Sequence, residues 1–105
     1  MSWNEVAKLS ELAMDSAKKI EVNGEAVCLV RNQAGVHAIA DACTHGAASL
    51  AEGAVTERGI ECWLHGAIFA LETGEALTPP ASKAVEVFEV KVDGDGDDAV
   101  VSVSV

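Results

Sequence analysis

Residues 20–40, IEVNGEAVCLVRNQAGVHAIA, contain three short apolar segments separated by two turn sequences. The dipeptide Asn23-Gly24 joins segments 20–22 and 25–31, and both residue types tolerate the positive φ angles of a two-residue hairpin turn. Residues 32–35 then lead to segment 36–40 through a connection of ordinary hairpin length. The stretch therefore predicts three consecutive antiparallel strands.

Similar short apolar segments follow towards the C-terminus. Residues 59–62 and 67–71 predict two strands, and residues 85–92 and 99–105 predict two more, which residues 93–98 join. The alternation within 99–105 places Ala99, Val101, Val103 and Val105 on one face and Ser102 and Ser104 on the other. The apolar phase changes between Val87 and Phe88, which predicts a bulge or a twist there.

Residues 9–19 are the one helical candidate, with Ser10 as a possible cap and Glu11 in the first turn. We expect one or two turns of helix there at most. The remaining segments predict a small all-β domain, either a sandwich or an open barrel, with one long irregular insertion that begins at residue 43.

Composition and charge limit the possible functions. The 105 residues suit a single globular domain spanning 1–105. Seven basic residues against 17 acidic ones give a net charge of -10, which disfavours nucleic acid and anionic membranes as partners. The first residues lack a signal-peptide pattern, so the cytoplasm is the expected compartment. Three cysteines, an odd number, favour a metal or redox site over a disulfide framework.

The insertion contains two pairs of potential metal ligands. Cys43-Thr-His45 is followed after 16 residues by Cys62-Trp-Leu-His65, and a glycine follows each histidine. Thiolate and imidazole together suit iron–sulfur clusters, zinc or copper. Nucleic-acid-binding zinc fingers group their cysteines and their histidines, whereas here the two types alternate. In a Rieske [2Fe–2S] centre two cysteines hold one iron and two histidines hold the other. The spacing favours such a cluster and leaves zinc open.

The two boxes, CTHG at 43–46 and CWLHG at 62–66, resemble those of Rieske proteins. Residues 69–74 (FALETG) and 78–81 (TPPA) also match that family, so the resemblance covers nearly the whole chain. Within the family, the chain is most similar to the small ferredoxins of bacterial aromatic-ring-hydroxylating dioxygenase systems. Residues 43–53 look closest to the ferredoxins of carbazole dioxygenases.

The resemblance implies a fold and a ligand set. The fold would be an antiparallel β-sandwich with a small cluster-binding subdomain at about residues 43–80. Cys43 and Cys62 would bind the inner iron, and His45 and His65 the outer iron near the surface. Pro79-Pro80 would form a third loop over the cluster.

The resemblance also implies a function. The chain would be a one-electron carrier, not an enzyme, with one [2Fe–2S] cluster per chain. It would pass electrons from an NAD(P)H-dependent flavin reductase to the terminal oxygenase of an aromatic-ring dioxygenase, and it would be a monomer. Two alternatives remain at this stage: a zinc-stabilised interaction module without redox activity, and a Rieske-like subunit of another reductase.

The chain departs from the family pattern at two positions that bear on the cluster. Trp63 stands where relatives commonly have proline, and it would shield the cluster or take part in docking. Ala67 stands where respiratory Rieske proteins have a serine donor, and the chain has no tyrosine. Because hydrogen bonds to sulfur stabilise the reduced cluster, we predict a low reduction potential, about -150 mV.

Three further features have structural interpretations. Cys28 lies within an apolar segment and is expected to be a buried thiol. His37 has no cysteine at ligand spacing and is expected to be structural. Residues 93–98 begin like a calcium loop, but Asp98 and Ser104 occupy the positions that need glycine and glutamate, so we expect a solvated turn.

Overall fold

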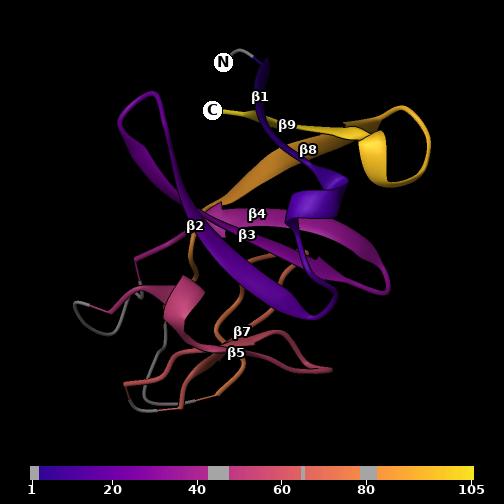
Figure 1. The fold of residues 1–105 in the computed structure, drawn as a ribbon. Helices are drawn as coiled ribbons and strands as arrows, with labels where there is room; N and C mark the ends of the chain where they lie inside the picture. Colours follow the sequence, from indigo (N-terminus) through magenta and orange to yellow (C-terminus); the bar gives the residue numbers. More distant parts are fainter. Residues whose placement is uncertain (1–2, 43–47, 65, 79–82) are drawn as a thin grey trace.

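The computed structural model describes residues 3–42, 48–64, 66–78 and 83–105, which form two antiparallel sheets (Figure 1). The larger sheet has the order β1-β9-β8-β4-β3-β2 and the smaller one the order β5-β6-β7. The strands of the larger sheet are β1 (Trp3–Lys8), β2 (Ser16–Val22), β3 (Glu25–Asn32), β4 (Gly35–Ala40), β8 (Val87–Asp93) and β9 (Val100–Ser104). Those of the smaller sheet are β5 (Ala54–Val55), β6 (Ile60–Glu61) and β7 (Ile68–Phe69).

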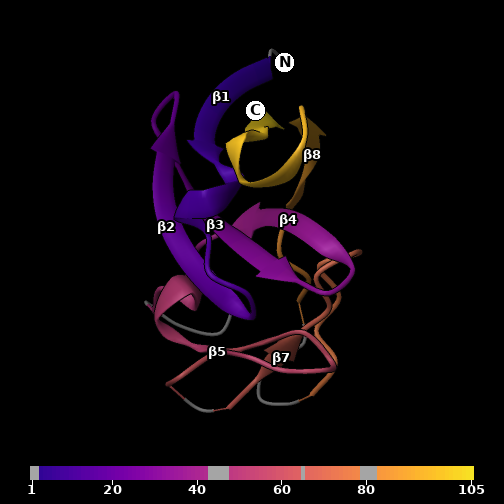
Figure 2. The ribbon, with the colours of Figure 1, turned by 45° about the vertical axis from the view of Figure 1, so that its right-hand side comes forward.

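Three short 3₁₀ turns complete the described elements: η1 (Leu9–Glu11), η2 (Leu50–Glu52) and η3 (Gly96–Asp98). Figure 2 shows how the larger sheet curls, with β1 and β2 on one side and β8 on the other. The smaller sheet lies below it, at the end away from β1 and β9 (Figure 1). The predicted all-β, antiparallel class is therefore confirmed.

The predicted meander of residues 20–40 is the centre of the larger sheet. Asn23 and Gly24 have φ angles of 51° and 84°, as a tight hairpin turn between β2 and β3 requires. Strand β3 pairs with β2 from Glu25 to Arg31 and with β4 from Val27 to Asn32. Because β3 is paired on both edges, all its central backbone groups have partners within the sheet.

Strand β3 is also buried on both faces, which explains its unbroken apolar sequence. Val27 and Leu29 pack into an upper core, while Cys28 and Val30 pack into a lower core. The upper core also contains Leu12, Val22, Ala38, Phe88, Val101 and Val103. The lower core also contains Ile39, Ala48, Leu50, Ile60, Cys62, Ala67, Phe69, Leu71 and Val85. The lower core joins the large sheet to the small one.

The phase change in residues 85–92 has a different cause from the predicted bulge. Strand β8 begins at Val87, and Val87 and Phe88 pair in regular register with Ile39 and Ala38. Val85 precedes the strand and is buried in the lower core, whereas Phe88 is buried in the upper core. The change of phase therefore marks the passage of the chain from one core to the other.

The helical prediction for residues 9–19 is wrong beyond its first turn. Only η1 is helical, and residues 16–19 belong to strand β2, where Lys18 and Lys19 pair with Leu29 and Cys28. Ser10 is not the cap, because the carboxylate of Glu11 accepts the N–H of Lys8 at 2.7 Å. Sheet pairing has overridden the helical propensity of these residues. Strands β1 and β5 were not predicted.

Candidate metal centre

One of the four predicted ligands, Cys62, lies among the described residues. Cys43, His45 and His65 lie outside them, and so does Pro79-Pro80. The segments that carry these residues, however, are bounded by described residues on both sides. Hydrogen bonds between described residues fix the ends of each of these segments.

Cys62 directly follows β6, and its side chain is buried in the lower core. Its backbone N–H donates to the carbonyl oxygen of Ala67 at 2.7 Å, and its own carbonyl accepts the N–H of Gly66 at 2.9 Å. Gly66 has a φ of 77°, which favours glycine. The second box is therefore closed into a tight turn that holds the cysteine inward.

The residues after Cys62 point the other way. Trp63 is 53% exposed and Leu64 is 37% exposed, although both are large apolar residues. A buried thiol is thus followed directly by two exposed apolar side chains. Of the two roles considered for Trp63, its exposure favours docking over shielding.

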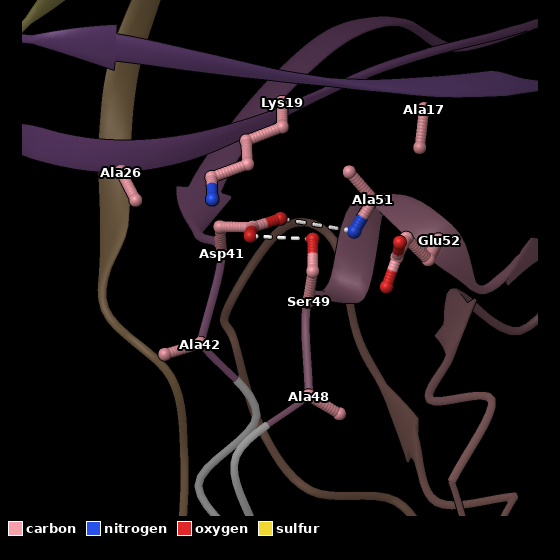
Figure 3. A pocket seen from close by; sticks show the side chains of 9 residues that line it. All are labelled: Ala17, Lys19, Ala26, Asp41, Ala42, Ala48, Ser49, Ala51 and Glu52. Atoms are coloured by element: carbon pink, nitrogen blue, oxygen red, sulfur yellow. Dashed lines mark hydrogen bonds between the residues drawn. The ribbon is translucent and has the colours of Figure 1, made fainter.

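The first box, residues 43–46, is bounded by Asp41 and Ser49. Ala42 and Ser49 form an antiparallel bridge, and the Asp41 carbonyl accepts the N–H of Leu50 at 2.7 Å. Figure 3 shows the carboxylate of Asp41 accepting two more hydrogen bonds, from the Ser49 hydroxyl at 2.6 Å and the Ala51 N–H at 2.9 Å. The two ends of this segment are therefore joined at its base.

The segment with Pro79-Pro80 is fixed at both ends in a similar way. The hydroxyl of Thr78 accepts the N–H of Ile68 at 2.9 Å, and the Leu77 N–H donates to the Ile68 carbonyl at 2.7 Å. On the other side, the Val85 N–H donates to the carbonyl of Gly74 at 2.9 Å. Both anchors belong to strand β7 or to the loop that follows it.

Cys28 has the surroundings of an inert thiol, as predicted. It is fully buried in β3, and burial, together with the nearby negative charge of Asp41, raises the pKa of its thiol from 9.0 to about 12. The side chain therefore stays protonated at neutral pH, and a protonated thiol is a poor metal ligand.

His37 is also structural, as predicted. Its Nε2 lies 3.2 Å from the Asn32 side-chain oxygen, so the Nε2–H tautomer donates a hydrogen bond to that amide. Burial lowers the pKa of His37, and the negative charge of Glu72 opposes this shift in part. Within the described ranges, no group of three or more histidine, cysteine or carboxylate side chains forms another metal site.

The residues around Cys62 fit an iron–sulfur cluster. Its side chain lies in an apolar core that would keep water away from a metal bound by the soft thiolate. Cys62 is hydrogen-bonded to Ala67, just before β7, and Thr78 is hydrogen-bonded to Ile68 within β7. Sequence reasoning missed the residues that hold these loops, namely Asp41, Ser49 and Thr78. A polar residue on each flank of the insertion was the available signal.

The sequence matches a family model, that of the Rieske [2Fe-2S] domain, over residues 2–89. A curated relative is the ferredoxin component of the naphthalene 1,2-dioxygenase/salicylate 5-hydroxylase systems of Ralstonia sp.. It is 33% identical over 92 residues, which are 88% of each chain. The family match decides between the two metals that the ligand spacing left open, in favour of the cluster.

Two solved structures are similar in fold and in sequence. The ferredoxin of carbazole 1,9a-dioxygenase from Nocardioides aromaticivorans IC177 has a TM-score of 0.87, 30% identity and 97% coverage of both chains. The second comes from a complex of reduced oxygenase and oxidized ferredoxin in carbazole 1,9a-dioxygenase. It has a TM-score of 0.84 and 30% identity, and the match covers 96% of this chain and 92% of the other.

These matches span both sheets and the predicted cluster-binding segments, and the relatives are ferredoxin components rather than catalytic subunits. The relatives are therefore similar to this chain both in sequence and in fold, and the buried Cys62 and the hydrogen-bonded loop ends fit the family that they share. The chain accordingly belongs to the Rieske [2Fe–2S] family, as a ferredoxin-type electron carrier of an aromatic-ring dioxygenase system and not itself an enzyme.

Proposed function

We propose that Cys43 and Cys62 hold the inner iron of the cluster and that His45 and His65 hold the outer iron. We further propose that the electron comes from an NAD(P)H-dependent flavin reductase and goes to a terminal aromatic-ring oxygenase. The observation that carries the oxygenase assignment is the similarity along nearly the whole chain to a ferredoxin found in complex with the oxygenase of its system.

When bound, a [2Fe–2S] cluster supplies reversible one-electron chemistry. The chain's own residues supply the environment. Cys62 lies in the lower core, where packing against Leu50, Ile60 and Phe69 excludes water from its side chain. The 62–66 turn, closed by Gly66, directs the cysteine inward and leaves the following residues outside. Burial of the inner ligand and exposure of the next residues suit a site that exchanges electrons at the surface.

The exposed pair Trp63 and Leu64 supports docking at this end of the molecule. Exposed aromatic residues are enriched among the residues that contribute most to binding at protein interfaces. Encounters between electron-transfer proteins bury small areas and release quickly, so two apolar side chains beside the ligand loop are a suitable contact. Both the reductase and the oxygenase would use this end in turn.

Spectroscopy with matched variants tests the cluster and its ligands. Purified protein reduced with dithionite should give a rhombic EPR signal of the kind typical of mixed cysteine and histidine ligation. The variants Cys62→Ser and His45→Ala should lose that signal, whereas Cys28→Ala and His37→Ala, which change the third cysteine and the third histidine, should retain it. A colourless protein containing zinc would contradict the proposal.

Reconstitution tests the partners separately. The chain, a flavin reductase and a terminal oxygenase from one dioxygenase system should together oxidise an aromatic substrate at the expense of NAD(P)H. Trp63→Ala should slow this transfer while leaving the EPR signal unchanged, because the residue is exposed. Equal rates for the variant and the wild type would exclude Trp63 from docking.

The compartment and oligomeric state belong to the same proposal, as a monomer in the cytoplasm. In the described part of the chain, no helix is both long and apolar enough to cross a bilayer. Light scattering of the purified holoprotein measures the molar mass directly. A mass near 10.8 kDa per particle is the expected result.

A further inference from the structure

Asp41 is a buried carboxylate at the junction of the large sheet and the first box. Its side chain is 3% exposed, and Asp41 and Ser102 are the two buried polar residues among those the structure describes. Its backbone N–H donates to the carbonyl of Ala26 at 3.1 Å, which extends the β3–β4 pairing by one residue. Asp41 is therefore fixed to the rigid sheet.

From this position Asp41 holds the returning end of the segment. Its carboxylate oxygens accept hydrogen bonds from Ser49 and Ala51 (Figure 3), and its carbonyl accepts the N–H of Leu50, so three consecutive residues are bonded to it. A carboxylate is costly to bury unless donors surround it, and here two donors face its two oxygens. An apolar side chain at position 41 would be enough to fill the space. The presence of a carboxylate there indicates that its hydrogen bonds to Ser49 and Ala51 are needed.

The held end leads on to the second box. Leu50 is fully buried in the lower core, to which Cys62 also belongs, and η2 ends at Glu52, with Gly53 as its C-terminal cap. A Cβ atom on Gly53 would lie 1.8 Å from the carbonyl oxygen of Glu61, the residue before Cys62. The hydrogen bonds from residues 49–51 to Asp41 and the close approach of Gly53 to Glu61 therefore connect Asp41 to the strand that precedes Cys62.

We propose that Asp41 is a positioning residue whose carboxylate, bonded to Ser49 and Ala51, sets the distance between the two ends of the loop that carries Cys43 and His45. This inference rests on the ligand set proposed above. Without the carboxylate the loop would lose two of its fixed points and gain conformational freedom. The cluster would then be held less firmly and with altered ligand geometry.

The test compares four variants of the holoprotein: Asp41→Ala, Asp41→Asn, Ser49→Ala and the control Ser102→Ala. Ser102 is equally buried but lies in β9, at the other end of the molecule. The readouts are the rate of iron release to a chelator and the shape of the reduced EPR signal. Asp41→Ala should release iron at least about tenfold faster, equivalent to about 1.4 kcal/mol, and should change the signal shape.

Asp41→Asn keeps a side-chain oxygen for the Ala51 N–H and an amide that can donate to the Ser49 hydroxyl, so it should restore most of the wild-type behaviour. Ser49→Ala removes one bond and should have an intermediate effect, which keeps the test informative if Asp41→Ala does not fold. Ser102→Ala should match the wild type in both readouts.

Other outcomes overturn the inference. If Ser49→Ala and Asp41→Ala match Ser102→Ala, Asp41 does not position the loop. If Asp41→Asn is as impaired as Asp41→Ala, the negative charge and not the bonding geometry is what matters. A wild-type protein without a cluster would refute the proposed function and this inference together, whereas the first two results refute the inference alone.

Discussion

The large and small sheets are held together by different means. The large sheet has strands of five to eight residues, and its central strand β3 forms continuous backbone ladders with β2 and β4. The small sheet has three strands of two residues each. Strands that short cannot form a stable sheet by themselves. The small sheet therefore depends on what surrounds it.

The surroundings of the small sheet are the lower core and a set of single hydrogen bonds at the loop bases. Examples are the bond from Ile68 to the Thr78 hydroxyl and the bonds from Ser49 and Ala51 to Asp41. The large sheet is the rigid surface on which the small sheet packs, and Cys62 directly follows a strand of the small sheet. Stability and function are thus located in different halves, and the following predictions test that division.

The largest effect is expected from removal of the cluster with acid and a chelator. The amides of the small sheet and η2, such as Leu50, Ile60 and Phe69, should lose most of their protection from hydrogen exchange. A metal site contributes its binding free energy to the folding of the elements around it. The amide of Val101, in the upper core, should stay protected and serves as the control. Equal protection of both sheets in the apoprotein would contradict the division.

A second prediction concerns the close approach of η2 and β6. Gly53→Ala should destabilise the protein by about 3 kcal/mol, because its Cβ would meet the backbone carbonyl of Glu61 at 1.8 Å and a backbone atom cannot yield cheaply. Gly24→Ala is the control in the large sheet. It meets nothing within 4 Å, so only its positive φ costs energy, roughly 1–2 kcal/mol. Denaturant unfolding of both variants measures the two values.

The reduction potential gives a third and smaller effect. Ala67 is fully buried, and its carbonyl accepts the N–H of Cys62. Ala67→Ser should raise the midpoint potential by several tens of millivolts, because a hydrogen bond to a charged acceptor contributes about 1.5 kcal/mol and 59 mV corresponds to about 1.4 kcal/mol for one electron. Voltammetry of the two proteins measures the shift. An unchanged potential would mean that this side chain does not face a cluster sulfur.

The smallest effect is the pH dependence that His37 adds. Burial lowers its pKa from 6.5 in the folded state, so the unfolded chain binds the proton more readily. The contribution to stability is complete above pH 6.5 and is lost as the pH falls towards the folded pKa. His37→Gln should flatten this part of the stability profile, measured by urea midpoints at several pH values. A profile that is the same in both proteins would exclude His37 as its source.

Much of the large sheet could be predicted because its signals are local. Asn23-Gly24 specifies the hairpin, and the apolar run in β3 specifies burial. Strand β1 was missed because its pairing partner, β9, lies at the other end of the sequence and its register shifts between Glu5 and Ala7. Local alternation cannot reveal such a pairing.

In the candidate site, too, some residues could be predicted from the sequence and others could not. The ligand spacing pointed to the cluster because cysteine and histidine alternate, and in a Rieske centre two cysteines hold one iron and two histidines hold the other. Asp41 was not predicted, since its role depends on residues eight and ten positions further along the chain meeting it in space. The helix expected at 9–19 failed for a related reason: pairing with β3 determines the structure of Lys18 and Lys19. The ligand assignment of Cys43, His45, Cys62 and His65, and the single domain spanning 1–105, stay predictions.

Because β3 is buried on both faces, the Asn23-Gly24 turn, which sets the register of β3 against β2, determines which side chains enter each core. Successive residues of this strand belong to different cores, so a slip of one position against β2 would exchange the side chains of the two cores. Val27 would then face the small sheet, and Cys28 would face away from it. A single residue inserted into the turn would thus displace the face of the large sheet against which the small sheet packs.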